Sequence, residues 1–137
     1  MTKDKNPYEP HSARILKIHP QIQGHRLFQV KFEDDEIARS FSYKPGQFME
    51  VTVFGSGEAP FSISSSPTRP GIIEFCIRQT GKVTNALFNL SPNSQIGMRG
   101  PYGNGFPVET LENNDLLIVA GGLGMAPLRS LLWYILD

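Results

Sequence analysis

The sequence is poor in residues on which several large classes of protein depend. Its 137 residues include one cysteine, Cys76, which excludes a disulfide within the chain and a cysteine-rich metal site. Thirteen lysines and arginines balance thirteen aspartates and glutamates, so a nucleic-acid binder held by phosphate contacts is not expected. The apolar runs 116–120 and 131–136 are far shorter than the roughly 18 residues of a membrane span. With no signal peptide at its start, we expect a cytoplasmic protein without a membrane span.

A metal site is not expected either. The four carboxylates of 33–36 are consecutive, whereas a divalent cation needs ligands spaced to wrap around it. We interpret this run as the solvated tip of a hairpin.

The residues that are present indicate a mainly β fold. Apolar residues make up 39% of the chain, and thirteen glycines and eleven prolines separate short segments with alternating polarity. In the first segment, Ala13 and Ile15 share a face opposite Ile18. We expect an antiparallel barrel or sandwich whose strands include 12–18, 25–32, 48–54, 61–65 and 72–78, with a loop at 55–57.

Two segments depart from this pattern. Residues 82–90 have apolar positions at helical spacing, and 116–120 is apolar on both faces, as a buried parallel strand is. The glycines of 121–124 and a helix over 125–136, with Pro127 in its first turn, follow. We therefore expect a flexible lead-in (1–10), a barrel domain (11–110) and the start of an α/β domain (111–137) that is truncated or completed by another chain.

Four motifs are candidates for ligand binding. Residues 59–67 (APFSISSSP) set serine hydroxyls beside the ring of Phe61, which suits a flat heteroaromatic ligand; a water-facing edge strand is the alternative. Residues 78–84 (RQTGKVT) open a helix, where Thr84 either caps it or binds an anion. Residues 99–107 (RGPYGNGFP) predict a rigid loop. Residues 121–127 (GGLGMAP) lie between a strand and a helix, where open α/β sheets bind nucleotides, although GxGxxG is not met.

In this order the motifs resemble those of the ferredoxin–NADP reductase superfamily, over about residues 10–137. That family implies a Greek-key β-barrel that holds FAD or FMN, followed by an α/β domain for NAD(P)H. The finer texture is similar to the gamma subunit of NAD(P)-linked nickel–iron hydrogenases and sulfhydrogenases, and to the corresponding subunit of anaerobic sulfite reductase.

The resemblance assigns roles to residues of this chain. It places the hydroxyl of Ser62, as the catalytic group, near the hydride-accepting nitrogen of the flavin. Ala59 and Phe61 replace the family's arginine and tyrosine, and Arg78 or Lys82 is the candidate to supply the missing charge. The cofactor-binding residues it implies are Phe61, Ser62, Ile63, Ser64, Cys76, Ile77, Arg78, Gly81, Lys82, Val83, Thr84, Gly121, Gly122 and Gly124. For Cys76, a buried core thiol is the alternative.

The function implied is that of a flavin-binding electron-transfer subunit, which passes electrons between NAD(P)H, FAD and iron–sulfur carriers in a complex with other redox subunits. An iron–sulfur cluster is expected in the intact subunit or in partners, since this chain has one cysteine. The NAD(P)H site is expected to be incomplete. Two alternatives stay open: the electron-transfer subunit of a dihydroorotate dehydrogenase, and a barrel without cofactor that acts as an interaction module.

Overall fold

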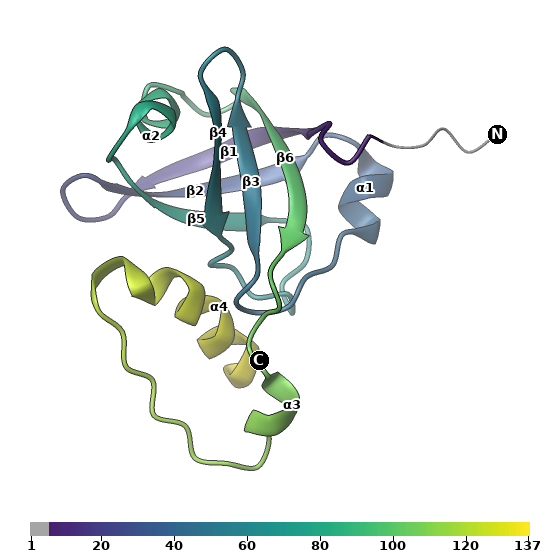
Figure 1. Cartoon of the computed structure of the whole chain (residues 1–137), viewed down its shortest axis with the longest axis vertical. Coiled ribbons are helices and arrows are strands. Elements are labelled where there is room, and N and C mark those ends of the chain that lie inside the picture. Colours follow the sequence, from purple (N-terminus) through teal and green to yellow (C-terminus); the bar gives the residue numbers. More distant parts are fainter. Residues whose placement is uncertain (1–5) are drawn as a thin grey trace.

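One antiparallel sheet dominates the computed structural model, which describes residues 6–137. Its six strands are ordered β4-β3-β6-β1-β2-β5, so that β6 returns between β3 and β1. The strands β1, β2 and β5 cross behind β3, β4 and β6 (Figure 1). The bounds are β1 His11–Pro20, β2 His25–Phe32, β3 Phe48–Val53, β4 Gly57–Ser62, β5 Ile73–Arg78 and β6 Gln95–Tyr102. The expected mainly β, antiparallel fold is confirmed.

The sheet is not closed into a barrel. Within residues 6–137, β4 and β5 end the strand order and no ladder joins them. Pro60 lies in β4 and has no backbone N–H to donate, which suits an edge strand. Just beyond β4, the N–H of Ser64 donates to the carbonyl of Glu74 at 2.8 Å. This contact joins the two edges, so the sheet is rolled without full pairing.

The core lies between the two crossing groups of strands, and the predicted alternation places it correctly. Phe28, Val30 and Phe32 of β2 are buried. In β3 every second residue is buried, as expected from a strand with one face on a core. Buried aliphatic and aromatic side chains from the other strands complete this core: Ala13, Ile15, Ile73, Phe75, Ile77, Ile96 and Met98.

The expected face of Ile18 is wrong because β1 contains a bulge. The register with β2 shifts between Ile15 and Lys17, and one extra residue reverses the side to which later side chains point. Ile18 therefore packs against the same core as Ala13 and Ile15.

Three boundaries also differ from the expectations. The predicted strand 61–65 is instead β4, Gly57–Ser62, so Gly57 belongs to a strand rather than a loop. The predicted rigid loop 99–107 is part of β6 up to Tyr102, because this stretch pairs with β3. The predicted helix 82–90 is α2, Lys82–Phe88.

The acidic run is not a hairpin tip. Asp34 caps helix α1, Asp35–Ser40, and its Oδ1 accepts from the N–H groups of Glu36 and Ile37 at 2.8 and 3.0 Å. Carboxylates favour a helix start because they satisfy free N–H groups and face the positive end of the helix dipole. Across residues 6–137, no three His, Cys, Asp or Glu side chains are grouped so as to hold a metal ion.

The C-terminal segment contains helix α3 (Val108–Leu111), the 3-10 turn η1 (Gly122–Gly124) and helix α4 (Met125–Leu136). The helix over 125–136 is confirmed. The predicted buried strand 116–120 is wrong: it has no regular structure, and Leu117 and Val119 are 89% and 79% exposed. An apolar strand needs paired neighbours, and none of the strands within 6–137 lies beside it. No helix in this described part is long and apolar enough for a bilayer.

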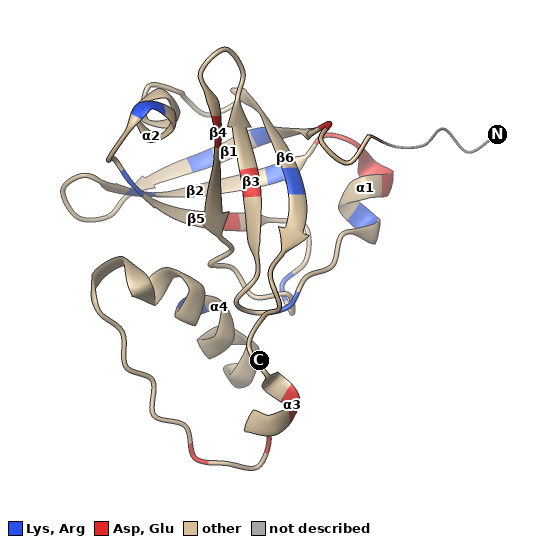
Figure 2. Ribbon diagram, viewed as in Figure 1, with Lys and Arg blue, Asp and Glu red and all other residues tan. Residues whose placement is uncertain are grey.

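Charges of both signs are interspersed over the strands in the view of Figure 2. Two sets of opposite charges cross between strands or loops: Arg99 of β6 bonds Glu58 of β4, and Arg14 of β1 bonds Glu33. This mixture agrees with the balanced composition and shows no basic stripe in that view.

Candidate functional site

A cleft of about 320 Å³ lies between β4, β5 and the start of α4. On the sheet side it is lined by Pro60, Phe61, Ser62 and Cys76, and on the other by Leu123, Gly124, Ala126 and Pro127. The lining is mostly apolar, with one hydroxyl and one thiol. Such a slot suits a flat ring with a few polar atoms.

Four of the predicted site residues meet in this cleft: Phe61, Ser62, Cys76 and Gly124. The ring of Phe61 is half-buried and Ser62 ends β4, so both present side-chain atoms to the cleft. Cys76 is partly exposed here, and burial raises the pKa of its thiol, while the Arg129 charge lowers it. Its alternative as a fully buried core thiol is therefore wrong.

The other serines of 62–66 turn inward, which neither interpretation of the motif anticipated. Ser64 is fully buried and its hydroxyl donates to the Glu74 carbonyl at 3.0 Å. The Ser65 hydroxyl accepts from the N–H of Glu74 and contacts the Tyr43 hydroxyl, at 3.1 and 3.0 Å. These hydroxyls hold the segment after β4 on β5, because a buried polar group needs a partner.

Two predicted cofactor residues have side chains in the core. Ile63 and Ile77 are 0% and 2% exposed and belong to the central hydrophobic cluster. Only their backbone atoms are therefore available to a ligand beside the sheet.

The start of α2 lies apart from the cleft, beyond the other end of β4 (Figure 1). The Thr84 hydroxyl accepts from the N–H groups of Thr80 and Gly81, both at 2.8 Å, so of the two predicted roles it caps the helix. Val83 packs against the core, while Arg78 and Lys82 are exposed. A side chain added at Gly81 would meet no atom within 4 Å, so its backbone borders open space.

Gly121 and Gly122 precede η1 and border open space in the same way. Only Gly124 of the three predicted glycines lines the cleft. Gly122 has a φ of +52°, the left-handed conformation that glycine adopts without strain, and it lets the exposed segment turn into α4.

The sequence interpretation missed Arg129 and Glu74, which join α4 to the sheet. An Arg129 nitrogen lies 2.5 Å from a Glu74 carboxylate oxygen and donates to the Ser64 carbonyl at 2.9 Å. Gln29 donates to the other Glu74 oxygen at 2.8 Å. Burial raises the pKa of Glu74, but the Gln29 and Arg129 hydrogen bonds outweigh it, so this pKa lies below its usual value. The available signal was a lone cation in an apolar helix and a lone anion in 72–77.

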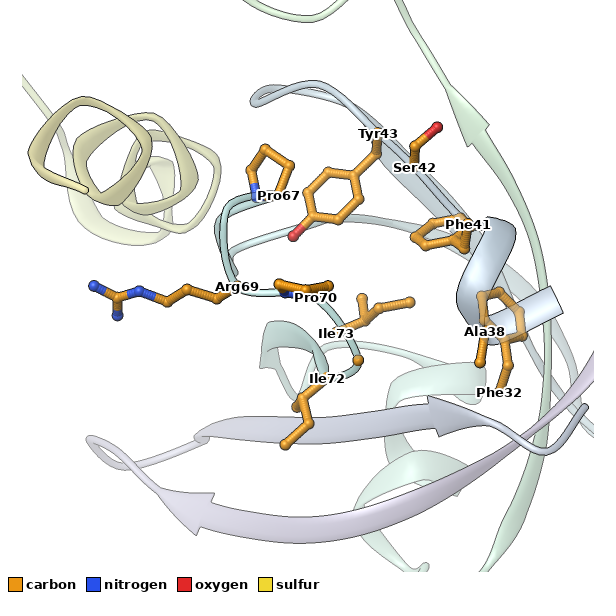
Figure 3. A pocket seen from close by; sticks show the side chains of 11 residues that line it. Phe32, Ala38, Phe41, Ser42, Tyr43, Pro67, Arg69, Pro70, Ile72 and Ile73 are labelled. Carbon is orange, nitrogen blue, oxygen red and sulfur yellow. The ribbon is translucent and has the colours of Figure 1, made fainter. Parts of the chain in front are cut away.

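A second hollow lies between α1 and the 67–73 turn, and Figure 3 shows it lined by Phe41, Tyr43, Pro70 and Ile73. Its volume is about 80 Å³, far below the 320 Å³ of the cleft at Phe61. It is too small for a flavin. Arg69 extends from its rim towards α4 (Figure 3).

Comparison with known proteins identifies related sequences. A family model described as the oxidoreductase FAD-binding domain matches residues 18–106. The sulfhydrogenase 1 gamma subunit of Pyrococcus furiosus is 47% identical over 137 residues, which cover 100% of this chain and 47% of the relative. The sulfhydrogenase 2 gamma subunit of that organism is 48% identical over 132 residues, covering 96% and 46%. A probable dihydroorotate dehydrogenase B electron transfer subunit of Methanocella arvoryzae is 32% identical over 122 residues, covering 89% and 42%.

Solved structures share the fold at lower identity. A cytochrome P450 reductase of Amycolatopsis has a TM-score of 0.78 at 20% identity, covering 92% of this chain and 38% of its own. Ferredoxin–NADP+ reductase of Plasmodium falciparum has a TM-score of 0.74 at 20% identity, covering 96% and 52%. This chain spans about half the length of the curated relatives it matches.

Proposed function

Because this chain belongs to the oxidoreductase FAD-binding domain family, which confirms the expected resemblance, we propose that it binds FAD in the cleft beside Phe61. The observation that carries the proposal is the meeting of Phe61, Ser62 and Cys76 with Gly124 in one cleft of about 320 Å³. These residues come from three separate segments of the chain. Their convergence supports one binding site.

The residues at the cleft fit a flavin ring. Apolar walls at Phe61, Leu123 and Pro127 match its flat surfaces, and the open backbone at Gly124 admits a close approach. When bound, FAD supplies the capacity to take up a hydride and to release single electrons.

The chain's own contribution is to bind, orient and exclude water. The Phe61 ring covers one side of the ligand, and the Ser62 hydroxyl donates a hydrogen bond to a ring nitrogen. Gly121 and Gly122 border the approach of a nicotinamide, and the backbone near Gly81 faces the cofactor's phosphates. Arg78 and Lys82 provide the positive charge that Ala59 lacks; both side chains are exposed and free to reorient.

The wider function we propose is that of an electron-transfer subunit which passes electrons from NAD(P)H through FAD to iron–sulfur carriers on partner subunits. The sulfhydrogenase gamma type is favoured because the identity reaches 47% and covers the whole chain. The dihydroorotate dehydrogenase type is the second candidate, at 32% identity over 89% of the chain. A cytoplasmic site of action and the domain division at about residue 110 complete the proposal.

The first experiment is a titration of the purified full chain with FAD, followed by quenching of flavin fluorescence. We expect saturable binding that Phe61→Ala weakens about tenfold, which corresponds to about 1.4 kcal/mol. Phe54→Ala is the matched control: Phe54 lies at the far end of β3, 55% exposed, where it faces Gly97 of β6. The control should bind like the wild type.

Failure of the wild-type chain to bind would contradict the proposal and favour the interaction module. Equal losses in both phenylalanine variants would place the flavin outside the cleft. Addition of NADH or NADPH under argon to the loaded protein then tests the wider function, since bleaching of the bound flavin reports electron transfer.

A further inference from the structure

The side chain of Arg129 lies at the junction of all three segments that line the cleft. Its guanidinium contacts the carbonyl of Ser64 and the carboxylate of Glu74. Ser64 is two residues beyond Ser62, and Glu74 is two residues before Cys76, so each contact adjoins a wall of the cleft. Arg129 itself follows Pro127, which lines the opposite wall.

We propose that Arg129 is a positioning residue that holds the start of α4 over β4 and β5 and thereby sets the width of the cleft. This proposal rests on the proposed function for its significance, but its geometry concerns the chain alone. One guanidinium can perform this task because it presents several N–H donors in a fixed plane, which a lysine does not. Gln29 holds the far side of the Glu74 carboxylate and so fixes the acceptor.

The surroundings make this contact stronger than an exposed ion pair. The Glu74 side chain is 14% exposed and that of Arg129 is 32% exposed. Partial burial limits the competition from water and salt that weakens surface pairs. Loss of Arg129 would leave the half-buried Glu74 carboxylate with Gln29 as its neutral donor, which favours separation of α4 from the sheet.

A second contact fixes the other end of α4. Arg69 bonds Asp137, with 2.6 Å between Nη2 and Oδ1, and its guanidinium lies 4.1 Å from the centre of the Trp133 ring. Neither Trp133 nor Asp137 lines the cleft. This outer contact therefore provides a matched control: its loss should loosen α4 without widening the cleft.

Cys76 reports the width of the cleft because it lines it and is the only thiol in the chain. We compare the rate at which a disulfide reagent labels it in the native full-length chain. Removal of Arg129 also removes the positive charge that lowers the pKa of this thiol. A purely electrostatic effect would therefore slow labelling, whereas an opened cleft accelerates it.

The expected result is that Arg129→Met accelerates labelling about tenfold, as a tenfold change in the open population requires about 1.4 kcal/mol. Arg129→Lys should give an intermediate rate, and Arg69→Met the wild-type rate. Circular dichroism checks that each variant is folded. Should Arg129→Met fail to fold, Glu74→Gln replaces it, with labelling rates corrected for the thiolate fraction from a pH profile of each variant.

Unchanged or slower labelling in Arg129→Met, or in Glu74→Gln if that variant is the one used, would overturn the proposal, as would equal acceleration in Arg69→Met. FAD titration adds an independent readout: the dissociation constant should rise about tenfold in Arg129→Met and stay unchanged in Arg69→Met. If the wild-type chain binds no FAD, the proposed function fails, but the labelling rates still decide whether Arg129 closes the cleft.

Discussion

Two equally buried serines are expected to respond in opposite ways to the same substitution. Ser130 of α4 and Ser64 are both 0% exposed. The Ser130 hydroxyl has no hydrogen-bond partner among residues 6–137, while the Ser64 hydroxyl donates to a carbonyl at 3.0 Å. A buried hydroxyl without a partner carries a desolvation cost of about 1–3 kcal/mol.

Ser130→Ala should therefore stabilise the protein by about 1–2 kcal/mol, helped by the better helix propensity of alanine. For a chain of this length the melting temperature should rise by about 3–6 °C. Ser64→Ala removes a satisfied hydrogen bond and should destabilise the protein by about 1 kcal/mol.

Urea unfolding measures both changes. Circular dichroism follows the sheet, and the fluorescence of Trp133, the only tryptophan, follows α4. The reasoning is refuted if Ser130→Ala is no more stable than the wild type, or if both variants shift the midpoint in the same direction.

Three further predictions concern other parts of the chain. Hydrogen bonds from Arg99 hold the pKa of Glu58 below its usual value, so this pair stabilises the fold above the unfolded pKa and loses that effect as the pH falls through the folded one. Glu58→Gln should thus be less stable than the wild type at pH 7, and urea midpoints should converge in acid; a constant difference contradicts this. Gly46→Ala should cost about 2 kcal/mol or more, because its φ is +93° and the new Cβ would lie 2.8 Å from an aromatic ring. Gly55→Ala, at φ +83° with open space around it, should cost about 1 kcal/mol in thermal melts, and equal costs would contradict the steric argument. Leu117→Ser should leave stability within about 0.5 kcal/mol and reduce aggregation in light scattering, since this side chain is 89% exposed; a large loss of stability would show that the segment is packed.

The alternation of side chains made most of the sheet predictable. Phe28, Val30 and Phe32 share a face because a strand turns successive side chains to opposite sides, whatever lies beside it. The spacing of apolar residues likewise predicted α4, with Pro127 in its first turn. These features depend on neighbours in the chain. The order of the motifs predicted the family, which the comparison confirmed.

Where the prediction failed, a distant residue made the difference. An apolar pattern at 116–120 is compatible with a strand, but a strand forms only where another one pairs with it. The β1 bulge that turns Ile18 inward is visible only in its register against β2. The inward serines depend on Tyr43 and Glu74, which the sequence pattern does not place beside them.

The sequence by itself determined the strands, the final helix and the family, because local periodicity and motif order belong to the chain. Only the tertiary structure decided which residues form the cleft. Phe61, Cys76 and Gly124 meet there because rolling the sheet brings β4 towards β5 and places α4 against both. The contact between Arg129 and Glu74 spans 55 positions, and two lone charges that far apart find each other only when the intervening chain folds.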